Sequence, residues 1–190
     1  VKSASTVAIG QKVADAPANS TGVSLVRPGG RACYPAFWIR DFAMSLASGC
    51  IPNQEMLDAL LLTASCQCEE TRTLPTGGII PAGAIPDHIN FDGTPIFYPG
   101  TYDPERQGGE PWGILPSLDD HFYFIEMAWE CVSATGDIDV LRGIVKGKEL
   151  IQRLADAFAV PPRDSGSGLI RCTTENRGVS FGFTDTVVQT

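Results

Sequence analysis

The sequence predicts a mainly α-helical fold built from pairs of antiparallel helices. Apolar residues recur at a spacing of three and four along residues 57–64, which is the period of a helix that buries one face. The break Gly49-Cys50-Ile51-Pro52 separates this segment from an earlier run of helical composition, residues 36–48. The same order of helix, break and helix recurs after residue 117, so the sequence predicts repeated helical hairpins.

The first predicted hairpin begins with residues 36–48. After the break, Asn53 is a suitable N-cap for the second helix, because its side chain can accept a hydrogen bond from an unpaired backbone N–H. Residues 1–30 are small, polar and weakly patterned, apart from a stretch at residues 23–26 that fits a strand. The sequence therefore predicts two parts, an N-terminal arm over residues 1–35 and a helical domain over residues 36–190.

The second predicted hairpin follows Ser117, which can cap a helix that continues to about residue 134. That helix is apolar around much of its circumference, as expected of an inner helix buried on two sides. Asp137 or Asp139 can cap the partner helix, residues 140–158, which is amphipathic. Its apolar face is formed by Leu141, Ile144, Val145, Ile151, Leu154, Ala155 and Phe158, and its polar face by Lys146, Lys148, Glu149 and Arg153.

A third hairpin is predicted to begin with a helix at residues 184–190. Because the sequence starts at Val1 rather than at a methionine, and Thr190 falls inside this helix, we expect it to be part of a longer protein. Between the two full hairpins, residues 73–116 are rich in proline and glycine but also carry isoleucines and aromatic residues that can anchor a loop. A loop of this length in a compact domain is usually functional, so we expect it to be ordered and to contribute to a site.

The composition excludes several classes of partner. The chain has 22 acidic and 14 basic residues and a net charge of -8 without a basic cluster, so nucleic acid is not an expected partner. No apolar stretch reaches the roughly 20 residues of a membrane-spanning helix, so no membrane partner is expected. The six cysteines form no CxxC pair, and neither a His-x-x-x-His pair nor a GxGxxG loop occurs, so the sequence predicts no metal and no cofactor. It leaves oligomeric state and compartment open.

The stretch Trp38-Ile39-Arg40-Asp41 is the strongest candidate for a binding site. A guanidinium and a carboxylate form directional hydrogen bonds and an indole offers a flat stacking surface, a combination that suits a sugar. The same residues also fit a salt bridge that fixes the start of a helix, with Trp38 as part of the core.

Further candidates lie in the long loop and at the start of the second hairpin. His88 and Trp112, with the acidic residues around them, are suited to a substrate rim. Asp119 and Asp120 are adjacent and must point in different directions on a helix, so we expect one to face the ligand while the other caps the first turn. Neither histidine is accompanied by a nucleophile motif such as GxSxG, so a hydrolase triad is not predicted.

Three short motifs resemble the six-hairpin glycosidases, which include the glucoamylase, trehalase and processing α-glucosidase families. Trp38-Ile39-Arg40-Asp41 is similar to a Trp-x-Arg-Asp motif whose Arg and Asp hold sugar hydroxyls, and the segment from Trp112 to Asp119-Asp120-His121 is similar to residues that lead into a later inner helix. Gly182-Phe183-Thr184-Asp185-Thr186 resembles the Gly-Trp-Asp region that carries the general acid, with one residue inserted and Phe in place of Trp. The resemblance implies an (α/α)6 toroid, of which this chain would hold the first hairpins.

The resemblance also implies a glycoside hydrolase, in which one carboxylic acid protonates the leaving oxygen and a second carboxylate activates water with inversion. Asp185 is the implied acid, and the rings of Phe181 and Phe183 beside it would favour its protonated form, although the same aspartate also fits a helix N-cap. The second carboxylate is expected beyond residue 190. Alternatives are a sugar phosphorylase or epimerase, and a noncatalytic carbohydrate-binding or assembly module. The residues that would bind the carbohydrate substrate are Trp38, Arg40, Asp41, His88, Trp112, Asp119 and Asp120.

Overall fold

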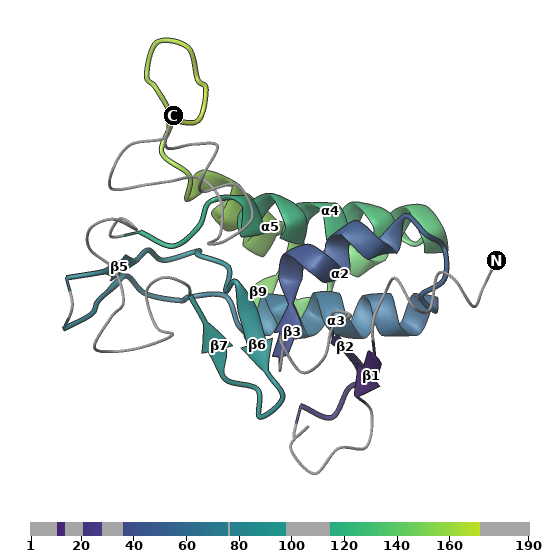
Figure 1. Ribbon diagram of the computed structural model, residues 1–190. Coiled ribbons are helices and arrows are strands. Elements are labelled where there is room, and N and C mark those ends of the chain that lie inside the picture. Colours follow the sequence, from purple (N-terminus) through teal and green to yellow (C-terminus); the bar gives the residue numbers. More distant parts are fainter. Residues whose placement is uncertain (1–10, 14–20, 28–35, 76, 98–114, 172–190) are drawn as a thin grey trace, which may run out of the picture.

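The structure, a computed structural model, describes residues 11–13, 21–27, 36–75, 77–97 and 115–171 (Figure 1). These residues form four α-helices, one short 3-10 helix and four small antiparallel sheets. The prediction of a mainly α, (α/α)6 toroid is therefore wrong for the described part of the chain, which is a mixed fold without a toroid. The physical reason is that segments expected to continue helices pair as short strands instead.

The helices pack around α4, Asp119–Thr135, which contacts α2, Ile39–Leu46, α3, Asn53–Ser65, and α5, Leu150–Ala159. The predicted helix after residue 52 is confirmed, and so is the helix predicted from Ser117 to residue 134, within two residues at its start. Trp129 of α4 is nevertheless 69% exposed. The prediction that this helix is buried on two sides is therefore wrong at Trp129.

A three-stranded sheet supports one end of these helices. It pairs β3, Ala36–Trp38, with β6, His88–Asn90, and β6 with β7, Pro95–Ile96 (Figure 1). Residues 36–38 were predicted to be helical, but pairing with β6 buries Ala36 and Phe37 in a strand, and the helix begins only at Ile39. The predicted loop over residues 73–116 is therefore partly strand in its described portion.

The predicted helix at residues 140–158 is wrong over its first half. A 3-10 helix, Ile138–Arg142, comes first, and Asp137 caps it by accepting a hydrogen bond from the backbone N–H of Asp139 at 3.0 Å. Next is a hairpin of β8, Ile144–Val145, and β9, Lys148–Glu149, and only then does α5 begin. Gly143 and Gly147 interrupt the apolar spacing, since glycine favours turns over helix.

This change of register makes part of the predicted apolar and polar faces wrong, although Leu154 is buried and Lys146 is exposed as predicted. Ile144, Ile151 and Phe158, expected in the core, are among the exposed hydrophobic residues, whereas Arg153, expected on the polar face, is fully buried. The core lies between the four helices and the sheet. Leu25 and Val26 of β2, Leu25–Arg27, are part of it, so a segment of the predicted arm packs into the domain.

Two further small sheets complete the described structure: β1, Gln11–Val13, pairs with β2, and β4, Arg72–Thr73, pairs with β5, Ile79–Ile80. Among the described residues, Cys50, Cys66, Cys68 and Cys131 are free thiols. No helix in this part of the chain has the length and apolar character needed to cross a membrane. The helix predicted at residues 184–190 lies outside the described residues.

Candidate functional site

The candidate site lies where β3 passes into α2, opposite the first turn of α4. Trp38 is the last residue of β3, and Arg40 lies two positions later in the first turn of α2. Asp119 and Asp120 begin α4, which packs against α2. Asp87 comes directly before β6 and accepts a hydrogen bond at its carbonyl oxygen from the backbone N–H of Ile39 at 3.2 Å.

An ion pair between Arg40 and Asp119 joins the two helices. The guanidinium Nη2 donates to Oδ2 of the carboxylate, and the two side chains are only 13% and 18% exposed. Burial by itself would lower the pKa of Arg40, but the carboxylates of Asp119, Asp120 and Asp87 outweigh this effect and raise it. The guanidinium also lies 5.8 Å from the centre of the Tyr123 ring. Arg40 is therefore a fixed cation that stays charged.

The indole of Trp38 stacks on the imidazole of His88. Their ring centres are 4.2 Å apart and their planes are inclined by 26°, because the two residues are directly opposed in the β3–β6 register. Nδ1 of His88 is 2.7 Å from Oδ2 of Asp87, which fixes the orientation of the ring. The stack forms a flat aromatic wall, of which His88 is the buried half and Trp38 the partly exposed half.

Asp120 is 1% exposed and lies near enough to Asp119 and Arg40 to be affected by their charges. The Ser117 hydroxyl donates a hydrogen bond to its Oδ2, whereas its Oδ1, like Oδ1 of Asp119, has no hydrogen-bond partner among the described residues. Burial raises the pKa of Asp120 well above that of an ordinary aspartate, and the nearby carboxylates of Asp87 and Asp119 raise it further. Burial also raises the pKa of Asp119, although Arg40 opposes this.

This arrangement can bind a polar, uncharged ligand that carries several hydroxyl groups. An unpaired buried carboxylate oxygen is costly, so Oδ1 of Asp119 favours a ligand that donates a hydrogen bond to it. The guanidinium of Arg40 can donate to ligand oxygens, and the Trp38 ring offers an apolar face. The described residues contain no group of three or more histidines, cysteines or acidic residues arranged to hold a metal ion.

The structure brings together Trp38, Arg40, His88, Asp119 and Asp120 of the predicted site. It does not bring in Asp41, whose side chain is on the exposed side of α2. Trp112 and Asp185 lie outside the described residues.

The sequence also allowed a salt bridge within Trp38-Ile39-Arg40-Asp41 that fixes the start of the helix. The structure has a salt bridge here, but with a different partner. Arg40 pairs with Asp119 rather than with Asp41, and no side chain caps α2. Ser117 was predicted to cap α4, but its hydroxyl binds the Asp120 side chain and α4 has no side-chain cap.

The roles of Asp87 and Tyr123 were not assigned from the sequence. Asp87 is one of the acidic residues around His88 that the sequence places in the predicted substrate rim, without a role of its own. Its position before a strand that pairs with residues 36–38 was the missing information, because that pairing places it beside Arg40. The spacing of Tyr123, four residues after Asp119 on the same helix, could have indicated that it neighbours the ion pair.

Comparison of the chain with family models, with curated proteins and with solved structures gives no match. The resemblance to six-hairpin glycosidases therefore rests on the three short motifs alone.

Replacing Asp120 with asparagine should stabilise the protein more at neutral than at acidic pH. The raised pKa means that the folded state holds the proton more tightly than the unfolded chain. The stability that protonated Asp120 gives to the folded state is thus fully present below the ordinary aspartate pKa. It is lost as the pH rises from there through the raised pKa of Asp120. Asparagine does not ionise, so urea unfolding should show a gain larger by about 1 kcal/mol at pH 7 than at pH 4.

The matched control for this experiment is Asp139→Asn, because Asp139 is exposed and outside the site. Its effect on stability should differ little between the two pH values. A gain for Asp120→Asn that is the same at both pH values would show that Asp120 does not hold a proton in the folded state.

Proposed function

We propose that the cluster around Arg40 binds a carbohydrate and that the protein is a glycoside hydrolase. The observation that carries the proposal is the Arg40–Asp119 ion pair, which lies beside the Trp38–His88 stack and leaves Oδ1 of Asp119 without a partner among the described residues. Sugars present hydroxyl groups that both donate and accept hydrogen bonds, and C–H faces that pack on aromatic rings. The three features of the cluster match these properties.

The residues of the cluster are better suited to hold a sugar than to cleave its bond. The carboxylate of Asp119 is engaged by Arg40, and Asp120 is buried, so neither is placed like the proton donor of a glycosidase. Cleavage needs a carboxylic acid at the leaving oxygen and a second carboxylate opposite it. Asp185 remains the proposed acid, from the motif around it, and inversion remains the proposed outcome.

The binding proposal is tested by titrating the chain with a panel of neutral mono- and disaccharides while tryptophan fluorescence or amide NMR shifts are recorded. Asp119→Asn should weaken binding of the best sugar by about tenfold or more, because a charged hydrogen-bond acceptor is lost. Asp139→Asn, an exposed aspartate in another ion pair, should have no effect. If no sugar binds, or if both variants bind equally well, the cluster is not a sugar site.

Asp185→Asn should lower the rate of hydrolysis of the best glycoside by about 100-fold or more while leaving sugar binding intact, since asparagine cannot donate a proton to the leaving oxygen. The measurement is initial release of reducing sugar by the protein. An unchanged rate would remove Asp185 as the acid. Sugar binding by the protein without hydrolysis of any glycoside would favour a noncatalytic binding module.

A further inference from the structure

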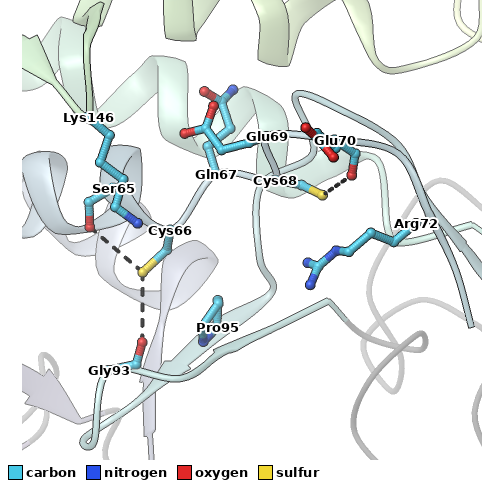
Figure 2. Close-up of a pocket in the computed structure, with 10 residues that line it drawn as sticks. All are labelled: Ser65, Cys66, Gln67, Cys68, Glu69, Glu70, Arg72, Gly93, Pro95 and Lys146. Atoms are coloured by element: carbon cyan, nitrogen blue, oxygen red, sulfur yellow. Dashed lines mark hydrogen bonds between the residues drawn. The ribbon is translucent and has the colours of Figure 1, made fainter.

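A second polar hollow, of about 380 Å³, lies apart from the residues of the Arg40 cluster. Its walls come from the end of α3 and the segment that follows it, from β4, from the β6–β7 turn and from the β8–β9 turn (Figure 2). A volume of this size suits a small ligand. Figure 2 shows Lys146 and Arg72 on opposite sides of the hollow, with the Cys66 thiol between Lys146 and Gly93.

Two cations of this hollow have no anionic partner among the described residues. Neither Arg72 nor Lys146 forms an ion pair there, although the Arg72 guanidinium lies 5.5 Å from the centre of the Phe97 ring. The carboxylate of Glu69 does not neutralise them, because it pairs with Arg153 at 2.8 Å. Glu70 is then the remaining carboxylate of the hollow, so cations are in excess at this point of a chain with a net charge of -8.

The Cys66 thiol does not balance the charge of Lys146. Burial raises the pKa of Cys66, and the opposing effects of Ser65 and Lys146 do not reverse this. The thiol therefore remains neutral at physiological pH. It is not a thiolate partner for the lysine.

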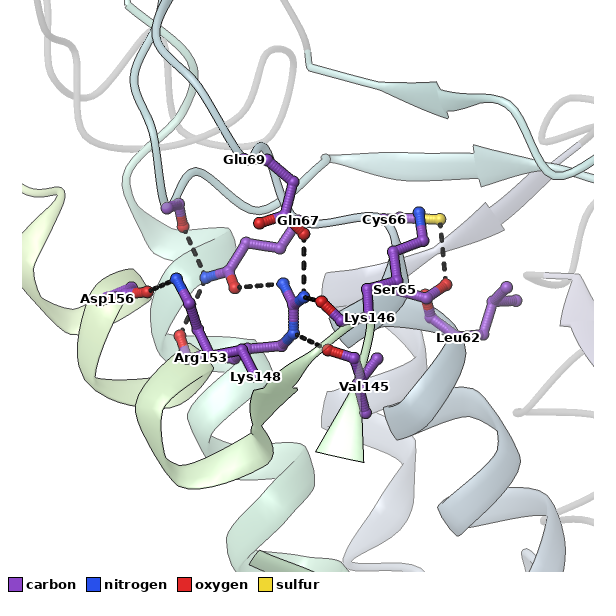
Figure 3. A network of polar contacts seen from close by, with 11 residues as sticks. Leu62, Ser65, Cys66, Gln67, Glu69, Val145, Lys146, Lys148, Arg153 and Asp156 are labelled. Carbon is purple, nitrogen blue, oxygen red and sulfur yellow. Dashed lines mark hydrogen bonds and ion pairs between the residues drawn. The ribbon is translucent and has the colours of Figure 1, made fainter. Parts of the chain in front are cut away.

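The backbone of Lys146 is unusual in the same place. Lys146 has a φ of 47° and Gly147 a φ of 78°, so both residues of the β8–β9 turn are left-handed. Asparagine or glycine is favoured in the first position of such a turn, and a lysine there carries some strain. The conformation is held by Arg153, which donates hydrogen bonds to the carbonyl oxygens of Val145 at 2.8 Å and Lys146 at 3.3 Å (Figure 3). The turn thus holds a cation at the hollow where an uncharged residue would be less strained.

We propose that this hollow binds the oxyanion group of a small ligand, a carboxylate or a phosphate, between the guanidinium of Arg72 and the ammonium of Lys146. The planar guanidinium can form two parallel hydrogen bonds with such a group, and the ammonium acts as a point charge from the opposite wall. The excess of positive charge selects anions over neutral ligands. The hollow shares no residue with the proposed sugar site, so the two proposals can fail separately.

The test is an NMR titration of the 190-residue chain at low ionic strength with inorganic phosphate and, separately, with acetate, following the amide shifts of residues 66–70 and 93. Saturable shifts with either anion are expected, and the anion that saturates at the lower concentration identifies the preferred group. Lys146→Asn and Arg72→Gln should each weaken this binding by about fivefold or more, as expected for the loss of one charged hydrogen bond. Because asparagine suits the turn, Lys146→Asn should keep or raise the thermal midpoint, so its loss of binding cannot come from unfolding.

The matched control is Lys148→Gln, which removes a lysine of the same hairpin that pairs with Asp156 and does not line the hollow. It should leave anion binding unchanged. Shifts that never saturate, that sodium chloride reproduces at the same ionic strength, or that Lys148→Gln reduces as much as Lys146→Asn would overturn the proposal.

Discussion

Arg153→Met is expected to lower the free energy of unfolding by about 3 kcal/mol, because it leaves the buried Gln67 side chain and two part-buried carbonyl oxygens without a donor. The Arg153 side chain is 0% exposed, and its guanidinium donates to the carbonyl oxygens of Val145 and Lys146 and to the side chains of Gln67 at 3.2 Å and Glu69 at 2.8 Å (Figure 3). The guanidinium therefore links α5, the β8–β9 turn and the segment after α3. Methionine fills much of the same volume but restores none of these bonds.

Urea unfolding of the variant and of Arg142→Gln provides the comparison. Arg142 also pairs with a carboxylate, that of Asp139, but the side chains of Arg142 and Asp139 are 78% and 72% exposed. Its replacement should change stability by no more than about 0.5 kcal/mol. A loss below about 1 kcal/mol for Arg153→Met would mean that water or rearranged side chains replace the guanidinium, and the buried network would not be a main source of stability.

Arg40→Met is expected to lower the free energy of unfolding by about 3 kcal/mol at neutral pH and to abolish sugar binding at the proposed site. The side chain is mostly buried, and its removal leaves Asp119 unpaired next to Asp87 and Asp120. The loss should be smaller at acidic pH, because protonation of Asp119 removes the unpaired charge. Urea unfolding at both pH values, with sugar titration in parallel, measures the two effects.

A double variant separates the ion pair from the packing of Arg40. In Arg40→Met with Asp119→Leu, no unpaired charge remains at this position, so the double variant should be more stable than Arg40→Met alone. Equal stability of the single and double variants would contradict the view that an uncompensated Asp119 carboxylate causes the loss. Sugar binding should stay absent in both variants, since both lack the guanidinium.

Several features of the fold follow from local sequence. The apolar spacing of residues 57–64 is uninterrupted, and the helix it predicts is observed as α3. The helix predicted after Ser117 is observed as α4 and ends at Thr135; the next residue, Gly136, has a φ of 69° and closes the last turn with a hydrogen bond from its backbone N–H to the Val132 carbonyl at 2.8 Å. In these segments the local preference and the packing agree, so pattern alone was sufficient.

Long-range pairing explains where the prediction was wrong. Residues 36–38 have a helical composition, yet they are a strand because β6, some fifty positions later in the sequence, supplies the hydrogen-bonding partners. Residues 143–149 form a hairpin whose turn carbonyls are bound by Arg153. Propensity is a weak preference that such tertiary contacts override.

For the candidate site, the sequence by itself determined which side chains are available: an indole, a guanidinium and a pair of adjacent aspartates at the starts of two helices. Only the tertiary structure decided how they combine. Arg40 pairs with Asp119 rather than with its neighbour Asp41, Trp38 stacks on His88, and Arg153 is buried although the pattern placed it on a polar face. The physical reason is that a buried charge requires a partner, and the packing of helices and strands from distant parts of the chain determines which partner lies within reach.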